Sequence, residues 1–409
     1  MSGARPPPTM HVALYSPAWP LKRHPNGVVT YVHWMREELR RRGHRVSVFT
    51  TLLDEPETDV HLVEGSLLRW RVRAWLRVGG DATERRILEW GRLLAETVLG
   101  VHRRTPIDVF EMEESFGWMA DVQAITGIPT VVKLHGPAFL SLVEEELDTP
   151  LAKAKIEREG RALRRMAYVT SPARRTLEET IARYGLKPAV ARHIDNPLSL
   201  PASAPVWALD RCDRKRLLFV GRFDKRKGGD LMLRAFDVLA RVDPSLQLTF
   251  VGPDGGVADP QGRRIGFHDA SAILCAGSTR SRIDFRGGLD PQSIYPLRSG
   301  AYMTIVASRW ENQSYTALEA MGQGCPLVSS DAGGQGEFVI DGSTGLLAKA
   351  GSDDDLAGRI AALLRDPQGA AELGRRAREH VLVEHSPSAV VAKTLEVYAS
   401  AIGRVRRSR

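Results

Sequence analysis

Short, uninterrupted hydrophobic segments recur along the chain, and most are followed by a turn and an amphipathic stretch. Such runs are typical of strands buried on both faces of a parallel sheet. The first strand is expected at 11–15, a helix at 28–42 and the next strand at 45–50. Further strands are expected at 107–111, 129–135, 167–171, 216–220, 246–251, 302–307 and 327–329, with a short strand and turn at 283–289. The alternation of strands and helices predicts an α/β protein.

The segment between Ile194 and Pro205 is rich in proline and small residues, which is typical of a linker. A chain of 409 residues is too long for one ordinary hydrophobic core, so two domains are expected. We place them at residues 1–197 and 206–385. The remaining residues, 386–409, are predicted to form a helix from about Ser388 that ends in a basic tail.

The formal net charge is +8, but the chain has no recognisable nucleic-acid module, so we do not expect nucleic acid as a partner. Anionic substrates and an anionic membrane surface remain compatible partners. No hydrophobic run reaches the roughly 18 residues of a spanning helix, and the first residues lack the apolar core of a secretory signal. We therefore expect a cytoplasmic protein, with peripheral contact at the inner membrane face left open.

The cysteines, Cys212, Cys275 and Cys325, lie far apart and are expected to be free thiols. The acidic run Ser352–Asp355 is explained by a helix N-cap with favourable dipole charges, which we prefer to a metal site. No metal and no other cofactor are expected.

The most informative stretch of the chain lies between Val306 and Leu347. A hydrophobic strand leads into a polar turn and a helix, with Glu311 before the helix and Glu319 within it. The residues between them at the helix start are Asn312, Gln313, Ser314 and Tyr315. A helix N-terminus attracts an anion, and ionised carboxylates accept hydrogen bonds from sugar hydroxyls.

This stretch resembles the nucleotide-sugar site of the family-4 retaining glycosyltransferases of the GT-B fold (glycosyl transferases group 1). The family pattern is two glutamates separated by seven residues, a small-residue turn, a strand and a Gly-Gly-x-x-Glu loop. The matching residues here are Glu311 and Glu319, 322–326, 327–329, and Gly333-Gly334 to Glu337. In one departure, Asn312-Gln313-Ser314 replaces the Gly-Phe-Gly that the family often has, so the donor sugar is not identified. The alternative interpretation is that the two glutamates are solvated helix residues.

The resemblance implies two Rossmann-like domains facing a central cleft, with the last helix packing back onto the N-terminal domain. It assigns Gly221-Arg222 and Lys227 to the donor diphosphate, Glu319 to the ribose and Glu311 to the donor sugar. Backbone amides after Glu311 and near Gly27 would complete the anion cradle. Two fixed cations beside a strand end suit a leaving diphosphate. The other cations of this turn, Lys225 and Arg226, are expected to be solvated.

Candidate residues in the first half follow predicted strands. Asn26-Gly27 lies at a strand-to-helix turn, where a backbone can approach a ligand, although an ordinary turn is the alternative. His135 ends a strand, and the resemblance places it near the reactive carbon of the donor sugar; the alternative is a structural histidine. Glu113 and Glu114 leave a strand end and either contact the acceptor or are simply solvated. Residues 67–78 alternate arginine with apolar residues, which predicts a charged edge strand or a membrane or acceptor patch.

The resemblance implies retaining transfer of a hexose-type sugar from a nucleoside-diphosphate sugar to an acceptor hydroxyl, in polysaccharide, glycolipid or glycoside biosynthesis. The acceptor would be a lipid-linked sugar, a saccharide or a small-molecule glycoside. The candidate catalytic residues are His135, Arg222, Lys227 and Glu311, and the donor-binding residues are Asn26, Gly27, Gly221, Arg222, Lys227, Glu311, Asn312, Gln313, Ser314, Tyr315 and Glu319. No residue stands out as a covalent nucleophile. Two alternatives remain: a GT-B-like sugar-nucleotide epimerase, and a non-catalytic, membrane-associated binding protein.

Overall fold

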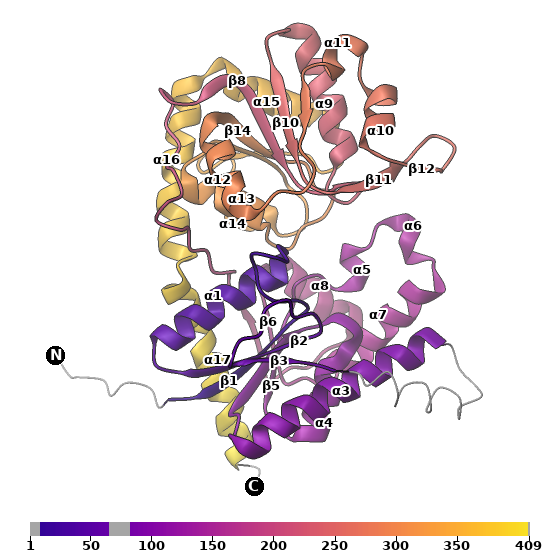
Figure 1. The fold of residues 1–409 in the computed structure, drawn as a ribbon, viewed down its shortest axis with the longest axis vertical. Helices are drawn as coiled ribbons and strands as arrows, with labels where there is room; N and C mark the ends of the chain where they lie inside the picture. Colours follow the sequence, from indigo (N-terminus) through magenta and orange to yellow (C-terminus); the bar gives the residue numbers. More distant parts are fainter. Residues whose placement is uncertain (1–8, 65–81, 408–409) are drawn as a thin grey trace, which may run out of the picture.

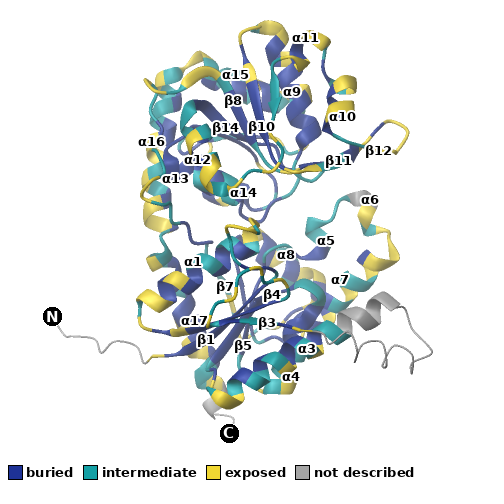
Figure 2. Ribbon diagram, in the orientation of Figure 1, coloured by how far each residue is buried: buried dark blue, intermediate teal, exposed yellow. Residues whose placement is uncertain are grey.

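The computed structural model describes residues 9–64 and 82–407, which form two α/β domains stacked along the long axis of the molecule (Figure 1). The strands at the centre of each domain are buried, and the exposed residues lie on the surrounding helices and loops (Figure 2). The expected edge strand at 67–78 lies outside the described residues. The predicted α/β architecture with two Rossmann-like domains is confirmed.

The N-terminal domain is built on a parallel seven-stranded sheet with the order β3-β2-β1-β4-β5-β6-β7. Its strands are β1 (His11–Ser16), β2 (Arg45–Thr50), β3 (Val60–Leu62), β4 (Val109–Glu113), β5 (Thr130–Lys133), β6 (Tyr168–Ser171) and β7 (Val190–His193). Its helices are α1 (Gly27–Arg41), α3 (Ala82–Arg104), η1 (Ser115–Gly117), α4 (Trp118–Thr126), α5 (Ala138–Ser141), α6 (Glu144–Leu147), α7 (Pro150–Leu163) and α8 (Arg174–Tyr184). Alternate residues of β1 enter two cores on opposite faces of this sheet, because successive side chains of a strand point to opposite sides.

The C-terminal domain contains a parallel six-stranded sheet with the order β13-β10-β8-β14-β15-β16 and a small sheet, β12-β11-β9. Its strands are β8 (Asp213–Val220), β9 (Phe223–Asp224), β10 (Gln247–Val251), β11 (Asp254–Ala258), β12 (Arg264–Ile265), β13 (Ile283–Phe285), β14 (Ala301–Val306), β15 (Leu327–Ser330) and β16 (Leu346–Ala348). Its helices are α9 (Gly229–Val242), α10 (Phe267–Leu274), α11 (Gly277–Arg280), α12 (Pro291–Gly300), α13 (Tyr315–Gln323), α14 (Gln335–Phe338), α15 (Asp353–Arg365) and α16 (Pro367–Glu384). In each large sheet the strand order reverses at the first strand, β1 or β8, and open α/β sheets bind ligands beside such a point.

The last helix, α17 (Pro387–Arg407), leaves the C-terminal domain and runs along the N-terminal one (Figure 1). Its residues Val390, Val391 and Tyr398 are fully buried in the same core as Val12 and Tyr31. The crossing of this helix, which the resemblance implied, is therefore confirmed.

The expected strand at 107–111 is displaced by two residues and is observed as β4, Val109–Glu113. Just before β4 pairs with β1, the Asp108 carboxylate accepts a hydrogen bond from the His11 backbone N–H (2.8 Å). With this displacement Glu113 belongs to the strand, and Glu114 is the first residue after it.

Candidate functional site

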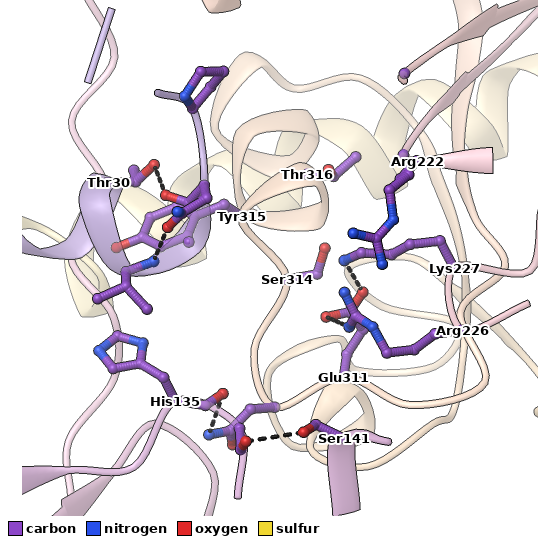
Figure 3. Close-up of a pocket in the computed structure, with 18 of the residues that line it drawn as sticks. Thr30, His135, Ser141, Arg222, Arg226, Lys227, Glu311, Ser314, Tyr315 and Thr316 are labelled. Carbon is purple, nitrogen blue, oxygen red and sulfur yellow. Dashed lines mark hydrogen bonds and ion pairs between the residues drawn. The ribbon is translucent and has the colours of Figure 1, made fainter. Parts of the chain in front are cut away.

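A cavity of about 1300 Å³ lies between the two domains, at the carboxyl ends of their central strands. Figure 3 shows part of it, with the cations of the C-terminal domain on one side and His135 and Thr30 on the other. Apart from the segment 67–78, which lies outside the described residues, the candidate residues named from the sequence line this cavity: Asn26, Gly27, Glu113, Glu114, His135, Gly221, Arg222, Lys227, Glu311, Asn312, Gln313, Ser314, Tyr315 and Glu319. The fold therefore brings these residues together, and their individual roles remain predictions.

The turn after β8 carries Arg222 and Lys227 into the cavity (Figure 3). Buried Asp224 fixes this turn, because its carboxylate accepts hydrogen bonds from the Lys227 backbone N–H (2.7 Å) and from the Arg222 guanidinium. Gly228 follows with φ 71°, and a Cβ there would lie 1.9 Å from the Ala307 carbonyl oxygen. Only glycine fits this position, which packs the turn tightly against the end of β14.

Glu311 lies among cations (Figure 3). Its carboxylate accepts hydrogen bonds from the Lys227 ammonium and, at 2.8 Å, from the Ser308 hydroxyl. Arg226 Nη1 lies 3.9 Å from Glu311 Oε2, and the Arg226 side chain is 27% exposed. The expectation that Arg226 is solvated is therefore wrong, since it faces a buried carboxylate. Burial opposes ionisation of Glu311, but Lys227 and Arg226 outweigh it and hold the pKa of Glu311 below its usual value.

The turn before α13 joins the two domains in addition to lining the cavity. The Asn312 side-chain amide donates to the Leu134 carbonyl oxygen at 3.0 Å. The Gln313 amide donates to Asp195 Oδ1 (3.0 Å) and accepts from the Asn196 backbone N–H (2.6 Å). These side chains occupy positions where the resembled family often has glycine and phenylalanine, so this chain has added polar contacts across its domain junction.

The Gly-Gly-x-x-Glu loop makes a further contact between the domains. The Glu337 carboxylate accepts hydrogen bonds from the backbone N–H groups of Arg174 (2.6 Å) and Arg175 (2.8 Å), at the start of α8. A carboxylate at this position satisfies unpaired N–H groups and complements the helix dipole. Glu337 of one domain therefore caps a helix of the other.

Glu319 is held by an arginine that sequence analysis missed. Arg298 of α12 is fully buried, and its guanidinium donates to Glu319 Oε2 (2.9 Å) and to Gln323 Oε1 (2.8 Å). The Glu319 side chain is 20% exposed and lines the cavity. No motif surrounds Arg298 in the sequence, and its burial follows from the packing of α12 against α13, β14 and β8.

Glu114 holds the turn that carries His135. Its two carboxylate oxygens accept hydrogen bonds from the backbone N–H groups of His135 (2.8 Å) and Gly136 (2.6 Å). Burial, reinforced by the charge of Glu113, raises the pKa of Glu114 to about 7. Since Glu113 is 7% exposed and Glu114 1%, the interpretation of these residues as solvated is wrong. Their contact with an acceptor stays a prediction.

The His135 ring lies edge-on to the Tyr31 ring, with centroids 5.0 Å apart. Lys133, two residues earlier, is buried and donates to the Ile194 carbonyl oxygen. Burial and the charge of Lys133 lower the pKa of His135 to about 3. His135 is therefore a neutral imidazole at physiological pH, with one nitrogen able to donate and the other able to accept a hydrogen bond.

Asn26 serves as the N-cap of α1, because its side-chain oxygen accepts hydrogen bonds from the N–H groups of Val28 (2.9 Å) and Val29 (3.0 Å). A Cβ added at Gly27 would lie 3.8 Å from the Tyr315 ring, so α1 and α13 approach each other closely at the cavity. The side chain of Asn26 is thus occupied by its own helix, and a ligand here would meet mainly backbone at Gly27.

Within residues 9–64 and 82–407, no group of three or more His, Cys, Asp or Glu side chains is arranged to hold a metal ion. In the same residues no helix combines the length and the apolar character needed to cross a bilayer. Cys212, Cys275 and Cys325 are free thiols.

Two family models match the chain: one described as glycosyltransferase family 4, over residues 25–200, and one described as glycosyl transferases group 1, over residues 209–380. The glycogen synthase of Mycobacterium tuberculosis is 33% identical over 188 residues, which cover 45% of this chain and 42% of that protein. The chain thus matches less than half the length of this relative.

Solved structures resemble the whole chain. A sucrose-phosphate synthase from Thermosynechococcus elongatus matches with a TM-score of 0.74 and 22% identity, covering 97% of this chain and 100% of that one. The Anabaena protein HepE in complex with UDP-glucose matches with a TM-score of 0.67 and 16% identity, covering 95% and 99%. At these identities the two structures establish the fold.

Proposed function

This chain belongs to the family-4 glycosyltransferases of the GT-B fold, and we propose that it transfers a hexose-type sugar from a nucleoside-diphosphate sugar to an acceptor hydroxyl with retention of configuration. The observation that carries the proposal is one cavity that joins an ionised Glu311 and its cations to Glu319 and a neutral His135. Such a cavity offers positive charge to a diphosphate and hydrogen-bonding groups to a ribose and a sugar. The product would belong to polysaccharide, glycolipid or glycoside biosynthesis.

Arg222 and Lys227 would hold the donor diphosphate. In the free protein the Lys227 ammonium is paired with Glu311, so an arriving diphosphate would share this cation with the carboxylate. Fixed positive groups stabilise the negative charge that develops on a leaving phosphate, and this kind of stabilisation is often the largest single contribution to catalysis. The complex of the fold relative HepE contains UDP-glucose, which makes a UDP-sugar the first donor to test.

The sugar would lie between Glu311 and His135, which line opposite sides of the cavity (Figure 3). Because its pKa is lowered to about 3, His135 is not the imidazolium that could act as a general acid. The neutral ring would instead exchange a hydrogen bond with a sugar hydroxyl. In the front-face route, the bond from the anomeric carbon to the phosphate oxygen breaks as the bond to the acceptor oxygen forms. The acceptor proton then passes to the departing phosphate oxygen, and no covalent enzyme intermediate is required.

We also propose that transfer is independent of metal, because Arg222, Arg226 and Lys227 supply positive charge where the diphosphate would bind. Transfer should persist in excess EDTA. A complete loss that magnesium or manganese restores would contradict this part of the proposal.

The proposal is tested with the purified protein and a panel of UDP-glucose, ADP-glucose and GDP-mannose. A ligand at 100 times its dissociation constant stabilises a protein by about 2.7 kcal/mol, so a thermal-shift assay should identify the preferred base. Transfer products are then sought with a glycoside acceptor, and NMR assigns the anomeric configuration. Release of an altered sugar nucleotide without acceptor would indicate an epimerase, and vesicle binding without any turnover would indicate a membrane-associated binding protein.

A further inference from the structure

The wall of the cavity contributed by the N-terminal domain differs in chemistry from the donor wall. It contains aromatic residues, among them Tyr15, Trp34, Phe116 and Trp118, together with polar residues that include Glu113 and Ser115. The lysines and arginines that line the cavity, within the described part of the chain, come from the C-terminal domain: Arg222, Lys225, Arg226, Lys227 and Arg264.

Phe116 has an unusual backbone conformation in this wall. Its φ is 58° and its ψ is 1°, and no other non-glycine residue in the described ranges 9–64 and 82–407 has a positive φ. A left-handed conformation is unfavourable for a residue with a Cβ, and residues held in it tend to occur at functional sites. Gly117 follows with φ 66°, so the chain makes two left-handed residues in succession at the exit of β4.

Contacts away from the cavity maintain this conformation. The Phe116 carbonyl oxygen accepts a hydrogen bond from Arg158 Nε (2.5 Å), and Arg158 Nη2 is in turn paired with Asp121 Oδ2 (2.7 Å). A Cβ at Gly117 would lie 2.7 Å from the Ala162 Cβ, so this turn packs directly against α7. These contacts therefore hold Phe116 in its strained backbone conformation. Strain that is maintained by the surrounding structure is common at functional sites.

The Phe116 ring belongs to a continuous aromatic group that links the ends of β1 and β4. It is stacked on the Trp118 ring with centroids 5.1 Å apart, and the Trp118 ring meets the Tyr15 ring edge-on at 6.0 Å. Lys155 Nζ also lies over the Phe116 ring, 5.0 Å from its centroid, so a ligand in the cavity would meet the part of the ring that these two side chains leave uncovered. Trp118 and Tyr15 are buried, whereas Phe116 is only partly buried and borders the cavity. We name these three residues the aromatic ledge.

We propose that the aromatic ledge is the acceptor platform, and that the acceptor presents an aromatic or other apolar ring face to Phe116. This inference rests on the proposed function, since it names the acceptor class of the same site. Aromatic side chains favour apolar and aromatic partners through burial and ring contacts. Phe116 lies three residues after the end of β4 and two residues after Glu114, which holds the His135 turn. An acceptor on the ledge would thus lie next to the groups proposed to hold the donor sugar.

Phe116→Gly provides the sharpest test, because it removes the ring and at the same time relieves the backbone. Glycine adopts a positive φ without steric cost, so the melting temperature of this variant should stay close to that of the wild type. The matched control is Phe139→Gly, which removes a phenylalanine from the same domain. Phe139 packs against Tyr184 in the domain core, so this control should lose several degrees of melting temperature and keep the acceptor preference.

Binding is measured by NMR titration with the nucleoside diphosphate that the wild type binds most tightly. The probes are p-nitrophenyl α-D-glucoside, methyl α-D-glucoside and glucose 6-phosphate. In the wild type the aryl glucoside should bind about fivefold to tenfold more tightly than the methyl glucoside, from one aromatic contact. Phe116→Gly should lose most of this preference without a change in nucleotide affinity.

The inference is overturned if glucose 6-phosphate binds more tightly than the aryl glucoside, or if the aryl glucoside does not bind. It is also overturned if Phe116→Gly keeps the aryl preference, or unfolds as early as the Phe139→Gly control. These failures are separable from failure of the proposed function, in which none of the nucleoside diphosphates would bind.

Discussion

Replacing Arg298 by methionine should weaken the binding of a nucleoside diphosphate much more than the binding of its deoxyribose counterpart. Arg298 holds one oxygen of the Glu319 carboxylate at 2.9 Å, which leaves the second oxygen for a ribose hydroxyl. Methionine has a similar length but cannot donate, so the carboxylate loses its fixed orientation. Arg298 would thus act as a positioning residue, without touching the ligand itself.

The magnitude follows from the type of contact. A hydrogen bond to a charged group contributes about 1.5–3 kcal/mol. Since the Glu319 side chain is 20% exposed and retains some contact, we expect a loss of about 1–2 kcal/mol, or about fivefold to thirtyfold in affinity. Arg298→Lys should fall between wild type and methionine, because one ammonium cannot serve both Glu319 and Gln323 with the geometry of a guanidinium.

The assay is calorimetric titration of UDP or ADP, whichever binds, together with the matching 2′-deoxy and 3′-deoxy nucleotides. The ratio of affinities isolates the ribose contact, because a general loss of stability affects both members of a pair. Arg378→Met is the matched control, since this arginine donates to the Gly322 carbonyl oxygen, one turn of α13 beyond Glu319. Equal losses for ribose and deoxyribose forms in Arg298→Met would refute the positioning role. A wild type that does not distinguish them would show that Glu319 does not bind the ribose.

Four further outcomes are expected. Glu114→Gln places an amide N–H group against the N–H groups of His135 or Gly136, so turnover should fall about tenfold or more while nucleotide affinity holds. Glu157→Gln, whose side chain is 69% exposed and does not line the cavity, is the control. Burial raises the pKa of Glu114 from 4.5 to about 7 in the folded protein, so the free energy of unfolding of the wild type should fall as pH rises through this range. Glu114→Gln should make this dependence on pH weaker. A free energy of unfolding that rises with pH over the same range would contradict the prediction. Lys227→Ala should lower turnover at saturating donor by about 10²–10³-fold, with Lys225→Ala within a few-fold of wild type; the reverse order would show that the turn is assigned wrongly. Asn312→Gly removes the hydrogen bond to the Leu134 carbonyl oxygen, which joins the two domains. Small-angle scattering of this variant should show a larger radius of gyration without nucleotide and a larger decrease when nucleotide is added. Profiles identical to those of the wild type would show that this contact does not hold the domains together.

The donor motif could be predicted from the sequence because its parts are close together in the chain. The family pattern that this segment resembles spans one strand end, one turn and one helix, with Glu311 before α13 and Glu319 within it, and both residues line the cavity. The same reasoning located His135 and Arg222 at strand ends, and the cavity lies at these ends.

The supporting groups could not be predicted, because their burial depends on distant partners. Glu114 accepts hydrogen bonds from residues 21 and 22 positions later, and Arg226 faces a carboxylate on another element. A charged residue in a sequence is normally interpreted as solvated, and only the fold shows which ones are enclosed. Arg298 illustrates this best, since nothing in its neighbourhood distinguishes it from a surface arginine.

The crossing of α17 also bears on the order in which the chain can fold during synthesis. The N-terminal domain emerges first from the ribosome, yet Val390, Val391, Tyr398 and Ala401 of the last helix are fully buried in its core. The C-terminal domain core uses residues from about Leu198 to Val381 and is complete before that helix is made. Domains made later in a chain usually finish later. Here the first domain must keep an apolar groove open until the residues of α17 have been synthesised, so the second domain can reach its final packing before the first.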